Sequence, residues 1–317
     1  MEADAAKDVA FVIVINAGSG SGNSALVRER VVERLTVAAC RFEFVEITDT
    51  SHIADIARGA AERARNSNAT LVAVGGDGTI NAVVSAALEW AVPLAVMPQG
   101  TFNFFGRTHG IPSATDAAID VLIDGRLMPA QVGRVNDRYF IVNASVGLYP
   151  QVLEDREAWK QRFGRSRMIA FWSGLMTLLR GYRSLRLDIT DIEGGERHLR
   201  TPTLVVANNA LQLELIGIAD APLIEQGQLV AITLGHIGKV QMIGLMLRGA
   251  LGKLGDAERV HSFGFRRMTV RVRGRKRRFK IALDGEIVHL HAPLTFEALP
   301  GALQLMVPQP GAEAVRA

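Results

Sequence analysis

The 317-residue chain has almost no cysteine: Cys40 is the only one. A single cysteine excludes an intrachain disulfide and argues against a zinc site built from thiolates, and it is typical of a reducing compartment. A large excess of charge is also absent, because 36 Lys and Arg against 32 Asp and Glu leave a net charge of +4. A balance this close to neutral does not by itself indicate nucleic acid as a partner.

Long hydrophobic runs are missing as well. The longest late run, Met168–Leu179, has 12 residues, and as a helix it would span about 18 Å, short of a hydrocarbon core of roughly 30 Å. The start of the chain, MEADAAKD, carries three acids and one base, whereas a secretory signal begins with positive charge. We therefore expect a cytoplasmic protein without a transmembrane span. Hydrophobic residues still make up 48% of the chain, and its length is typical of two domains.

The first 125 residues alternate between apolar, β-branched runs and longer segments with helical spacing. This alternation predicts a parallel, doubly wound α/β sheet, in which ligands bind at the carboxyl ends of the strands. The predicted strands are 9–15, 42–47, 69–74 and 94–97, and the predicted helices are 24–38, 52–65, 79–90 and 113–123.

Glycine-rich turns follow the first, third and fourth of these strands. Glycine lets main-chain N–H groups come close to a phosphate, and a helix N-terminus adds a favourable dipole. One such turn is weak evidence, since strand-to-helix turns use glycine anyway, but three at neighbouring strand ends predict a site for nucleotide phosphates. The candidate residues are Asn16, Gly18, Ser19 and Gly20, then Gly75, Gly76, Asp77, Gly78, Thr79 and Asn81, then Gly100, Thr101 and Asn103.

The string Gly75-Gly76-Asp77-Gly78-Thr79 matches neither GxxxxGK[ST] nor GxGxxG, the two common phosphate-binding patterns. It resembles the nucleotide loop shared by diacylglycerol kinases, sphingosine kinases, NAD kinases and phosphofructokinases. In such a loop the glycines leave room for a triphosphate, Asp77 can hold Mg²⁺ or its waters, and Thr79 can bind a phosphate or cap the helix. An N-cap role for Asp77 is the alternative.

Further motifs extend the resemblance along nearly the whole chain. They are NAGSG at 16–20, PQGTFNFFGR at 98–107, NASVGLY at 143–149, VANN at 206–209 and LDGE at 283–286. Together they resemble the bacterial diacylglycerol kinase-like lipid kinases. The resemblance implies ATP and Mg²⁺ as cofactors, a membrane lipid as acceptor and Asp284 as the general base for its hydroxyl proton, with Glu286 assisting. A plain hairpin turn at Asp284 is the alternative.

Some positions depart from the family's patterns. Ala17 stands where relatives have proline, and Phe104 stands where many have aspartate. The acidic stretch that many relatives carry near a structural metal is reduced to Asp220 and Glu225, which are weak candidate ligands, with an ordinary turn as the alternative. Thr48, after the second strand, matches another nucleotide-contacting position of the family, with helix capping as the alternative.

Beyond residue 128 short strands separated by turn residues predict a β-sandwich-like second domain with helical insertions at 150–182 and 238–253. By resemblance the last strand returns to the first domain. We expect an ATP-binding α/β domain over 1–128 and 300–317 and a lipid-binding domain over 129–299. The predicted strands are 131–136, 138–146, 186–192, 198–207, 228–233, 268–272, 279–283, 294–297 and 303–307.

Two stretches rich in Lys and Arg indicate the kind of partner that the protein binds. Arg266–Lys280 contains nine Lys or Arg and no acid, and Arg156–Arg186 contains eight, against one acid. Solvated faces are the plain interpretation, and nucleic acid is disfavoured because few aromatic side chains lie among the charges. An anionic membrane surface fits better, so we expect peripheral association with the inner face of the membrane. The oligomeric state stays open, with a homodimer as one option.

The sequence thus favours a lipid kinase, with diacylglycerol as the leading substrate and a sphingoid base, ceramide or phosphatidylglycerol as others. Two different functions remain open. A soluble NAD kinase-like enzyme would share the GGDGT loop, but the GTxN string and the late DGE motif favour the lipid kinases. A catalytically weak nucleotide- or lipid-binding regulator would explain Phe104, whereas Asp77 and Asp284 argue against it.

Overall fold

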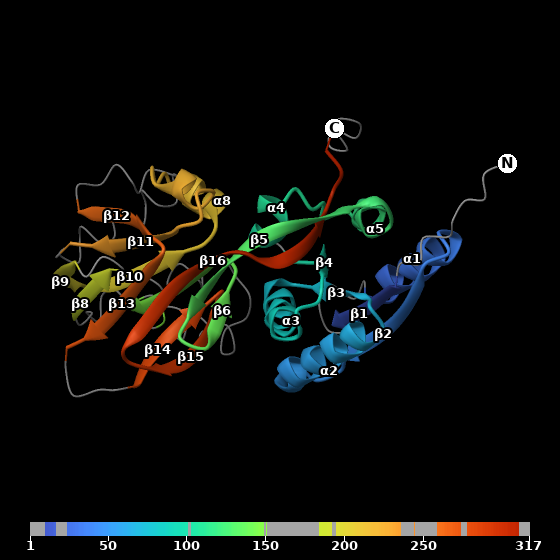
Figure 1. Cartoon of the computed structure of the whole chain (residues 1–317), viewed down its shortest axis with the longest axis horizontal. Coiled ribbons are helices and arrows are strands. Elements are labelled where there is room, and N and C mark those ends of the chain that lie inside the picture. Colours follow the sequence, from blue (N-terminus) through green and yellow to red (C-terminus); the bar gives the residue numbers. More distant parts are fainter. Residues whose placement is uncertain are drawn as a thin grey trace. The chain divides into compact units, whose positions relative to one another are not determined.

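A computed structural model of the chain describes residues 10–16, 24–100, 103–148, 150, 184–191, 195–235, 244, 259–273 and 278–310. The chain divides into two compact units: unit 1 comprises residues 1–131 and 301–317, and unit 2 comprises residues 132–300 (Figure 1). Two strands, β5 (Arg126–Val135) and β16 (Leu294–Val307), continue from one unit into the other. The two expected helical insertions lie almost wholly outside the described residues.

Unit 1 is built on a parallel sheet in which the strands follow the order β2-β1-β3-β4-β16. The doubly wound α/β architecture expected from the sequence is confirmed. Because all these strands are parallel, their carboxyl ends meet at one edge of the sheet. The strands are β1 (Ala10–Asn16), β2 (Arg41–Ile47), β3 (Thr70–Gly75) and β4 (Leu94–Pro98).

Helices cover both faces of this sheet. Helices α1 (Ser24–Val37) and α5 (Thr115–Asp124) pack on one face, where Phe11 and Ile13 of β1 join the helix residues in one buried cluster. On the other face lie α2 (Ile53–Asn66) and α3 (Asp77–Trp90) (Figure 1). Shorter helical elements are η1 (Thr50–His52) and α4 (Phe104–Thr108).

Unit 2 is a β-sandwich. One sheet has the order β16-β13-β8-β9 and is extended by β5 and β6, and the other has the order β12-β11-β10-β7-β14-β15. The strands are β6 (Arg138–Phe140), β7 (Asn143–Gly147), β8 (Leu185–Asp191), β9 (Glu196–Thr201), β10 (Thr203–Ala207), β11 (Leu229–Leu234), β12 (Val260–Phe265), β13 (Arg267–Val272), β14 (Arg278–Leu283) and β15 (Glu286–His291).

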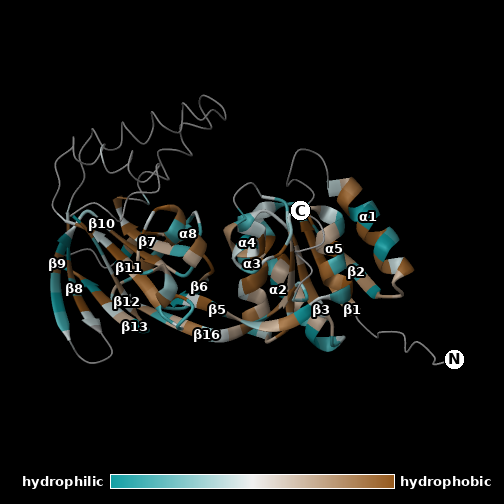
Figure 2. Ribbon diagram, turned by 90° about the horizontal axis from the view of Figure 1, so that it is seen from above, coloured by the Kyte–Doolittle hydropathy of each residue, from teal (hydrophilic) through white to brown (hydrophobic). Residues whose placement is uncertain are grey.

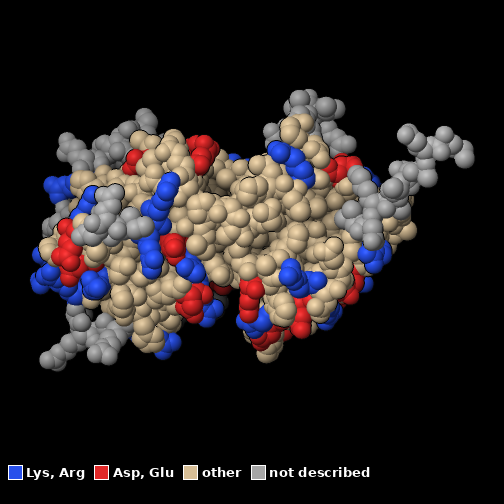
Figure 3. Space-filling view, viewed as in Figure 1, with Lys and Arg blue, Asp and Glu red and all other residues tan. Residues whose placement is uncertain are grey.

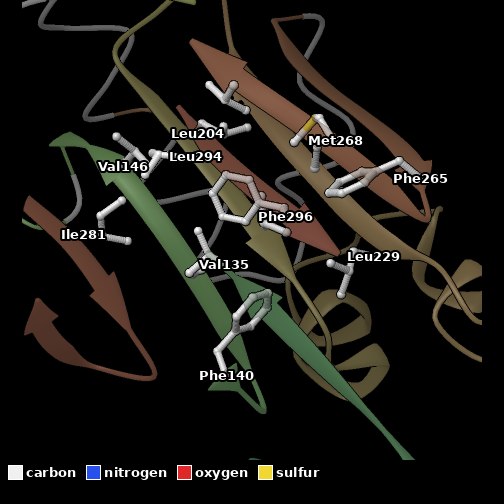
Figure 4. Close-up of a cluster of buried hydrophobic side chains, with 14 of the residues drawn as sticks. Val135, Phe140, Val146, Leu204, Leu229, Phe265, Met268, Ile281, Leu294 and Phe296 are labelled. Carbon is white, nitrogen blue, oxygen red and sulfur yellow. The ribbon is translucent and has the colours of Figure 1, made fainter. Parts of the chain in front are cut away.

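The core of unit 2 lies between these two sheets. Phe140, Leu204, Met268 and Phe296 are almost fully buried and belong to one apolar cluster (Figure 4). A second, smaller cluster lies beneath α8 (Ala210–Leu215) and η2 (Ala221–Leu223). In Figure 2 the strands β7, β10 and β11 are largely hydrophobic, whereas β8 and β9 are largely hydrophilic. This contrast agrees with an outer face of the β8–β9 sheet that meets solvent.

Several strand boundaries differ from those predicted. The segment 138–146 forms two strands, β6 and β7, and the segment 198–207 breaks at Pro202 into β9 and β10. The predicted strands 294–297 and 303–307 are parts of one 14-residue strand, β16. Strands β12 and β15 and the short helices α4 and α8 were not predicted, because each is too short or too polar to give a periodic signal.

Candidate functional site

The predicted residues of unit 1 gather where three parallel strands end. Asn16 ends β1, Gly75 ends β3, and Gln99 directly follows β4. The Asn16 side-chain amide donates a hydrogen bond to Thr79 Oγ1 at 3.3 Å, and the Gln99 N–H donates to the Gly75 carbonyl at 2.8 Å. These bonds join three turns that are far apart in the sequence into one surface.

The glycines of these turns serve different purposes. A Cβ on Gly75 would lie 2.8 Å from the Thr79 side chain, so this position has no room for a side chain. A Cβ on Gly76 would meet no atom of the described residues within 4 Å, and the Gly76 φ of −81° is open to any residue. Neither packing nor conformation therefore requires Gly76. Its missing side chain keeps the space over the N-terminus of α3 open, and a phosphate needs that space.

Asp77 is the first residue of α3, and Gly76 is its N-cap. The alternative interpretation of Asp77 as the N-cap is therefore wrong, because the cap has no side chain and the first-turn N–H groups receive no side-chain acceptor from it. The Asp77 carboxyl is half-buried, and desolvation raises its pKa above the usual range. A cation held beside this carboxylate would offset that cost.

The third turn lies against the second. A Cβ on Gly100 would lie 3.6 Å from Asp77 Oδ2. Further along, Asn103 is 4% exposed, has a positive φ of 43°, and accepts a hydrogen bond from the Gly106 N–H at 3.2 Å through Oδ1. The Asn103 amide nitrogen is buried and has no hydrogen-bond partner among the described residues. A buried donor without an acceptor costs about 1–3 kcal/mol, so this atom fits a bound acceptor such as a phosphate or nucleotide oxygen.

The remaining nucleotide candidates are placed as follows. Thr48 is exposed directly after β2, and Asp49, not Thr48, caps η1 by accepting the Ser51 N–H at 2.8 Å. Asn81 is half-buried in the first turns of α3. Gly78 lies between Asp77 and Thr79 at the start of the same helix. Gly18, Ser19, Gly20 and Thr101 lie outside the described residues.

Unit 2 holds the second group of candidates, around Asp284. Asp284 and Gly285 form the two-residue turn between β14 and β15, with φ of 46° and 90°, as in a type I′ hairpin. The alternative interpretation of a hairpin turn at Asp284 therefore describes the backbone correctly. The Asp284 side chain also makes contacts that a hairpin turn does not need. Its carboxylate accepts main-chain hydrogen bonds from Ile141 at 2.7 Å, from Val142 at 2.8 Å and from Asn143 at 2.8 Å.

Three motifs that are distant in the sequence meet at this carboxylate. Asn208 donates its side-chain amide to the Ile141 carbonyl at 3.2 Å. Its neighbour Asn209 caps α8 by accepting the Gln212 N–H at 2.9 Å, and the Gln212 side chain accepts from the Asn143 side-chain amide at 3.0 Å. The NASVG, VANN and DGE segments thus form one hydrogen-bonded network. Sequence analysis found the segments but not their contacts, because main-chain partners leave no pattern in the sequence.

Glu286 begins β15, opposite Leu283 of β14. The residue is exposed, yet the protein atoms around its carboxyl desolvate it and raise its pKa above the usual range. Asp220 precedes η2, and Glu225 is exposed just beyond it. Within the described ranges, no three His, Cys, Asp or Glu side chains are grouped as a metal site. No helix in the same ranges is long and apolar enough to cross a membrane.

Two family models match the chain. The diacylglycerol kinase catalytic domain matches residues 10–135, which include all three phosphate-loop segments. The YegS C-terminal NAD kinase beta sandwich-like domain matches residues 145–307, which include Asp284 and Glu286. The two models together cover both units and follow the order of the motifs.

Individual proteins similar to this chain carry the name diacylglycerol kinase. A Staphylococcus epidermidis diacylglycerol kinase is 46% identical over 95 residues, covering 29% of this chain and 30% of that protein. A Staphylococcus saprophyticus diacylglycerol kinase is 37% identical over 105 residues, covering 32% and 34%. The alignments therefore span only about a third of these curated relatives. A Bacillus anthracis diacylglycerol kinase structure has a TM-score of 0.66 at 17% identity and covers 96% of this chain and 97% of that one, which shows a shared fold.

Proposed function

Because the chain belongs to the bacterial diacylglycerol kinase-like lipid kinase family, we propose that it transfers the γ-phosphate of ATP to a hydroxyl of a membrane lipid. The observation that carries this proposal is the open space over the N-terminus of α3, which Gly76 leaves empty and beside which Asp77 begins the helix. A helix N-terminus with free first-turn N–H groups favours phosphate oxygens.

The nucleotide's phosphates would be held by the turns that follow β1, β3 and β4. The main-chain N–H groups at the start of α3 would face the phosphates, and the Asn103 amide would donate to one of their oxygens or to the sugar. Thr79 is buried and already bonded to Asn16, so its position is fixed before the nucleotide arrives. Gly18, Ser19, Gly20, Thr48, Asn81 and Thr101 complete the proposed set.

Asp77 is the residue proposed to hold Mg²⁺, directly or through water. Magnesium binds carboxylate and phosphate oxygens, and the desolvated carboxylate of Asp77 gains from a neighbouring cation. When bound, Mg²⁺ would neutralise charge on the transferred phosphate. Asp220 and Glu225 remain weak candidates for a separate structural metal.

Asp284 and Glu286 are the proposed catalytic carboxylates, with separable roles. Three main-chain donors hold the Asp284 carboxylate and favour its ionised form. A carboxylate held in this way orients groups well but gains less from accepting a proton. Glu286, whose pKa is raised by desolvation, is the better proton acceptor of the two. The family resemblance assigns the general base to Asp284, and the pH profile argued in the Discussion separates the two assignments.

Diacylglycerol is the proposed acceptor, since the curated relatives from Staphylococcus carry that name. A sphingoid base, ceramide or phosphatidylglycerol would present a similar hydroxyl at a bilayer surface. An acceptor that resides in a bilayer requires the enzyme to reach the membrane, so we also propose peripheral attachment at the inner face.

The test is transfer of labelled γ-phosphate from ATP to a panel of these lipids in mixed micelles, with and without Mg²⁺. We expect label on diacylglycerol, dependence on Mg²⁺ and a loss of at least about 100-fold in rate when a catalytic carboxylate is replaced. Label on NAD in the absence of lipid would favour the soluble-kinase alternative. ATP binding with no labelled product on any acceptor would favour a regulatory protein.

A further inference from the structure

The outer face of one sheet of unit 2 is rich in arginine. Strand β13 alternates cleanly: Met268 and Val270 are buried in the core, whereas Arg267 and Arg271 are exposed on the opposite face. Arg273 continues this alternation just beyond the strand and is also exposed. Three of the four outward positions from 267 to 273 therefore carry cations, and the fourth is Thr269.

The neighbouring strands extend the pattern sideways. Arg186 of β8 lies directly opposite Arg200 of β9, and Asp188 lies opposite His198. On the other side of β8, Arg271 lies opposite Asp188. Adjacent strands are about 4.8 Å apart, and like charges placed directly opposite each other are destabilising. The fold therefore brings together cations that repel one another.

Two carboxylates on this face, Asp188 and Glu196, offset part of this charge. Asp188 accepts hydrogen bonds from Arg273 Nε at 2.7 Å and contacts His198 Nδ1 at 2.7 Å, and both contacts lower the pKa of Asp188. Arg186, Arg200 and Arg271 have no ion-pair partner among the residues that the structure describes. In Figure 3 blue side chains, with red ones among them, lie over β8 and β9. We name Arg186, Arg200 and Arg271 the arginine face.

We propose that the arginine face docks unit 2 on a bilayer of anionic phospholipid. The proposal rests on the proposed function, since a membrane lipid as acceptor brings an anionic surface to the enzyme. Guanidinium groups bind phosphate oxygens in pairs of parallel hydrogen bonds. Phospholipid headgroups spread over a surface can relieve the repulsion between Arg186 and Arg200, which no described carboxylate does.

The neighbouring side chains favour lipid over single-stranded nucleic acid. The other outward positions of β8, β9 and β13 are Glu196, His198, Thr190 and Thr269, and none is the Phe, Tyr or Trp on which single-strand binders stack bases. An electrostatic contact of this kind weakens as salt rises, because exposed charges are screened beyond about 10 Å at 0.1 M.

The experiment is sedimentation of the full chain with phosphatidylglycerol–phosphatidylcholine vesicles, without ATP, at low and high salt. The test variant is R186Q/R200Q/R271Q, and the control is R63Q/R65Q/R126Q, which removes three exposed arginines of unit 1 and the same net charge. At about fivefold per arginine, we expect the test variant to lose about 100-fold in partitioning and the control to bind as the wild type does. Phosphorylation of detergent-dispersed lipid should be the same in all three proteins.

Equal loss of vesicle binding in both variants would show that only net charge matters and would overturn the proposal, as would unchanged binding of the test variant. Preferential binding of RNA over vesicles, lost in the test variant, would overturn it in favour of nucleic acid. If vesicle binding follows the prediction but no lipid is phosphorylated, the docking face stands and the proposed function fails. Thermal unfolding of each variant shows that the substitutions leave the fold intact.

Discussion

Asp284 and Asn143 are joined by two reciprocal hydrogen bonds: the Asn143 N–H donates to Asp284 Oδ1 at 2.8 Å, and the Asp284 N–H donates to the Asn143 carbonyl at 2.9 Å. The pair fixes the hairpin turn of β14–β15 to the start of β7. The side chain of Asp284 therefore has a structural task as well as its proposed catalytic one, and a change at this position affects both.

Replacing Asp284 by Asn tests the structural task. Asn has one acceptor oxygen where the carboxylate has two, so an amide N–H would face the main-chain donors of Ile141 or Val142. We expect Asp284→Asn to lower the free energy of unfolding by about 1–3 kcal/mol, measured by urea denaturation. Asp137→Asn is the matched control, since the Asp137 side chain is 79% exposed and its ion pair with Arg138 is 3.9 Å long. An unchanged stability of Asp284→Asn would contradict the structural task.

Glu286 should govern the pH dependence of the reaction. Its pKa is raised by desolvation, so as proton acceptor it becomes active only as pH rises through that raised value. We expect the wild-type rate to fall as pH is lowered, with the midpoint of this acid limb above the ordinary Glu range. Glu286→Gln should be slowed about 10²–10⁴-fold, and its remaining activity should lack the acid limb. If the limb persists in Glu286→Gln and disappears in Asp284→Asn, the proton acceptor is Asp284.

The same raised pKa has a consequence for stability. A carboxyl whose folded pKa is raised contributes stability that is fully present below its unfolded pKa and is lost as pH rises through the folded pKa. Urea denaturation should therefore show that the free energy of unfolding of the wild type declines as pH rises from the ordinary Glu pKa through the raised pKa of Glu286. The Glu286→Gln variant should lack this decline. This measurement needs no substrate and is independent of the catalytic assignment.

Gly133 makes a different kind of contact, which tests the sandwich core. It lies opposite Phe140 in the β5–β6 pair, and a Cβ there would come within 2.3 Å of the Phe140 ring. Gly133→Ala must push the buried ring aside, which costs about 1–3 kcal/mol. The check is the midpoint of urea unfolding, with Gly59→Ala as control. A Cβ on Gly59 meets no described atom within 4 Å, and because Gly59 lies inside helix α2, alanine should keep that midpoint at or above the wild-type value. A midpoint of Gly133→Ala equal to that of the wild type would show that the Phe140 ring has room to move.

The α/β half could be predicted from the sequence because its central strands are buried on both faces. Strands such as β1 and β3 form continuous apolar runs, and glycines mark their carboxyl ends. Strand β15 was not predicted because its exposed positions are polar and β14 is its only partner among the described strands. Strand β12 contains Gly264, which sequence rules treat as a breaker, although the position needs glycine: a Cβ would lie 2.6 Å from Leu223 and Gln228 side-chain atoms.

The candidate site, like the fold, was predicted from the sequence only in part. Residue types and spacing identified Gly75, Gly76 and Asp77, since phosphate loops require small residues beside a helix start. The hydrogen bonds of Asp284 could not be predicted, because its partners are main-chain N–H groups. Why position 76 carries a glycine is also evident only from the structure, where the space beside Gly76 is open.

Gly76 and Gly75 therefore give a matched pair of substitutions in the nucleotide loop. At Gly76 an added methyl group meets no atom of the described residues, so Gly76→Ala should cost only the roughly 0.5–1 kcal/mol of stability by which alanine is a poorer N-cap than glycine. It should raise the KM for ATP at least about tenfold, equivalent to 1.4 kcal/mol. Gly75→Ala should lower stability as well, because its Cβ collides with Thr79. An unaltered KM in a stable Gly76→Ala protein would show that no phosphate occupies this space.

Asn103 offers the sharpest test of the nucleotide site, because Asp is nearly isosteric with Asn and tolerates the same positive φ of 43°. Asn103→Asp keeps an acceptor for the Gly106 N–H but puts an anionic oxygen in place of the amide nitrogen, which has no partner in the described part of the chain. If that nitrogen donates to a nucleotide oxygen, the donor is lost and two negative groups meet, so affinity for ATP should fall about 10–100-fold. Calorimetric titration with a non-hydrolysable ATP analogue measures it.

The control is Asn136→Asp in unit 2. Asn136 also has a positive φ, of 52°, but its side-chain amide already donates to the His291 carbonyl at 3.1 Å, so this substitution should cost stability and leave ATP affinity unchanged. Equal affinity in Asn103→Asp and wild type would mean that the buried amide serves the loop rather than the nucleotide. Reduced affinity in both variants would point to a global effect of added charge. Only a loss confined to Asn103→Asp supports a direct contact between this amide and ATP.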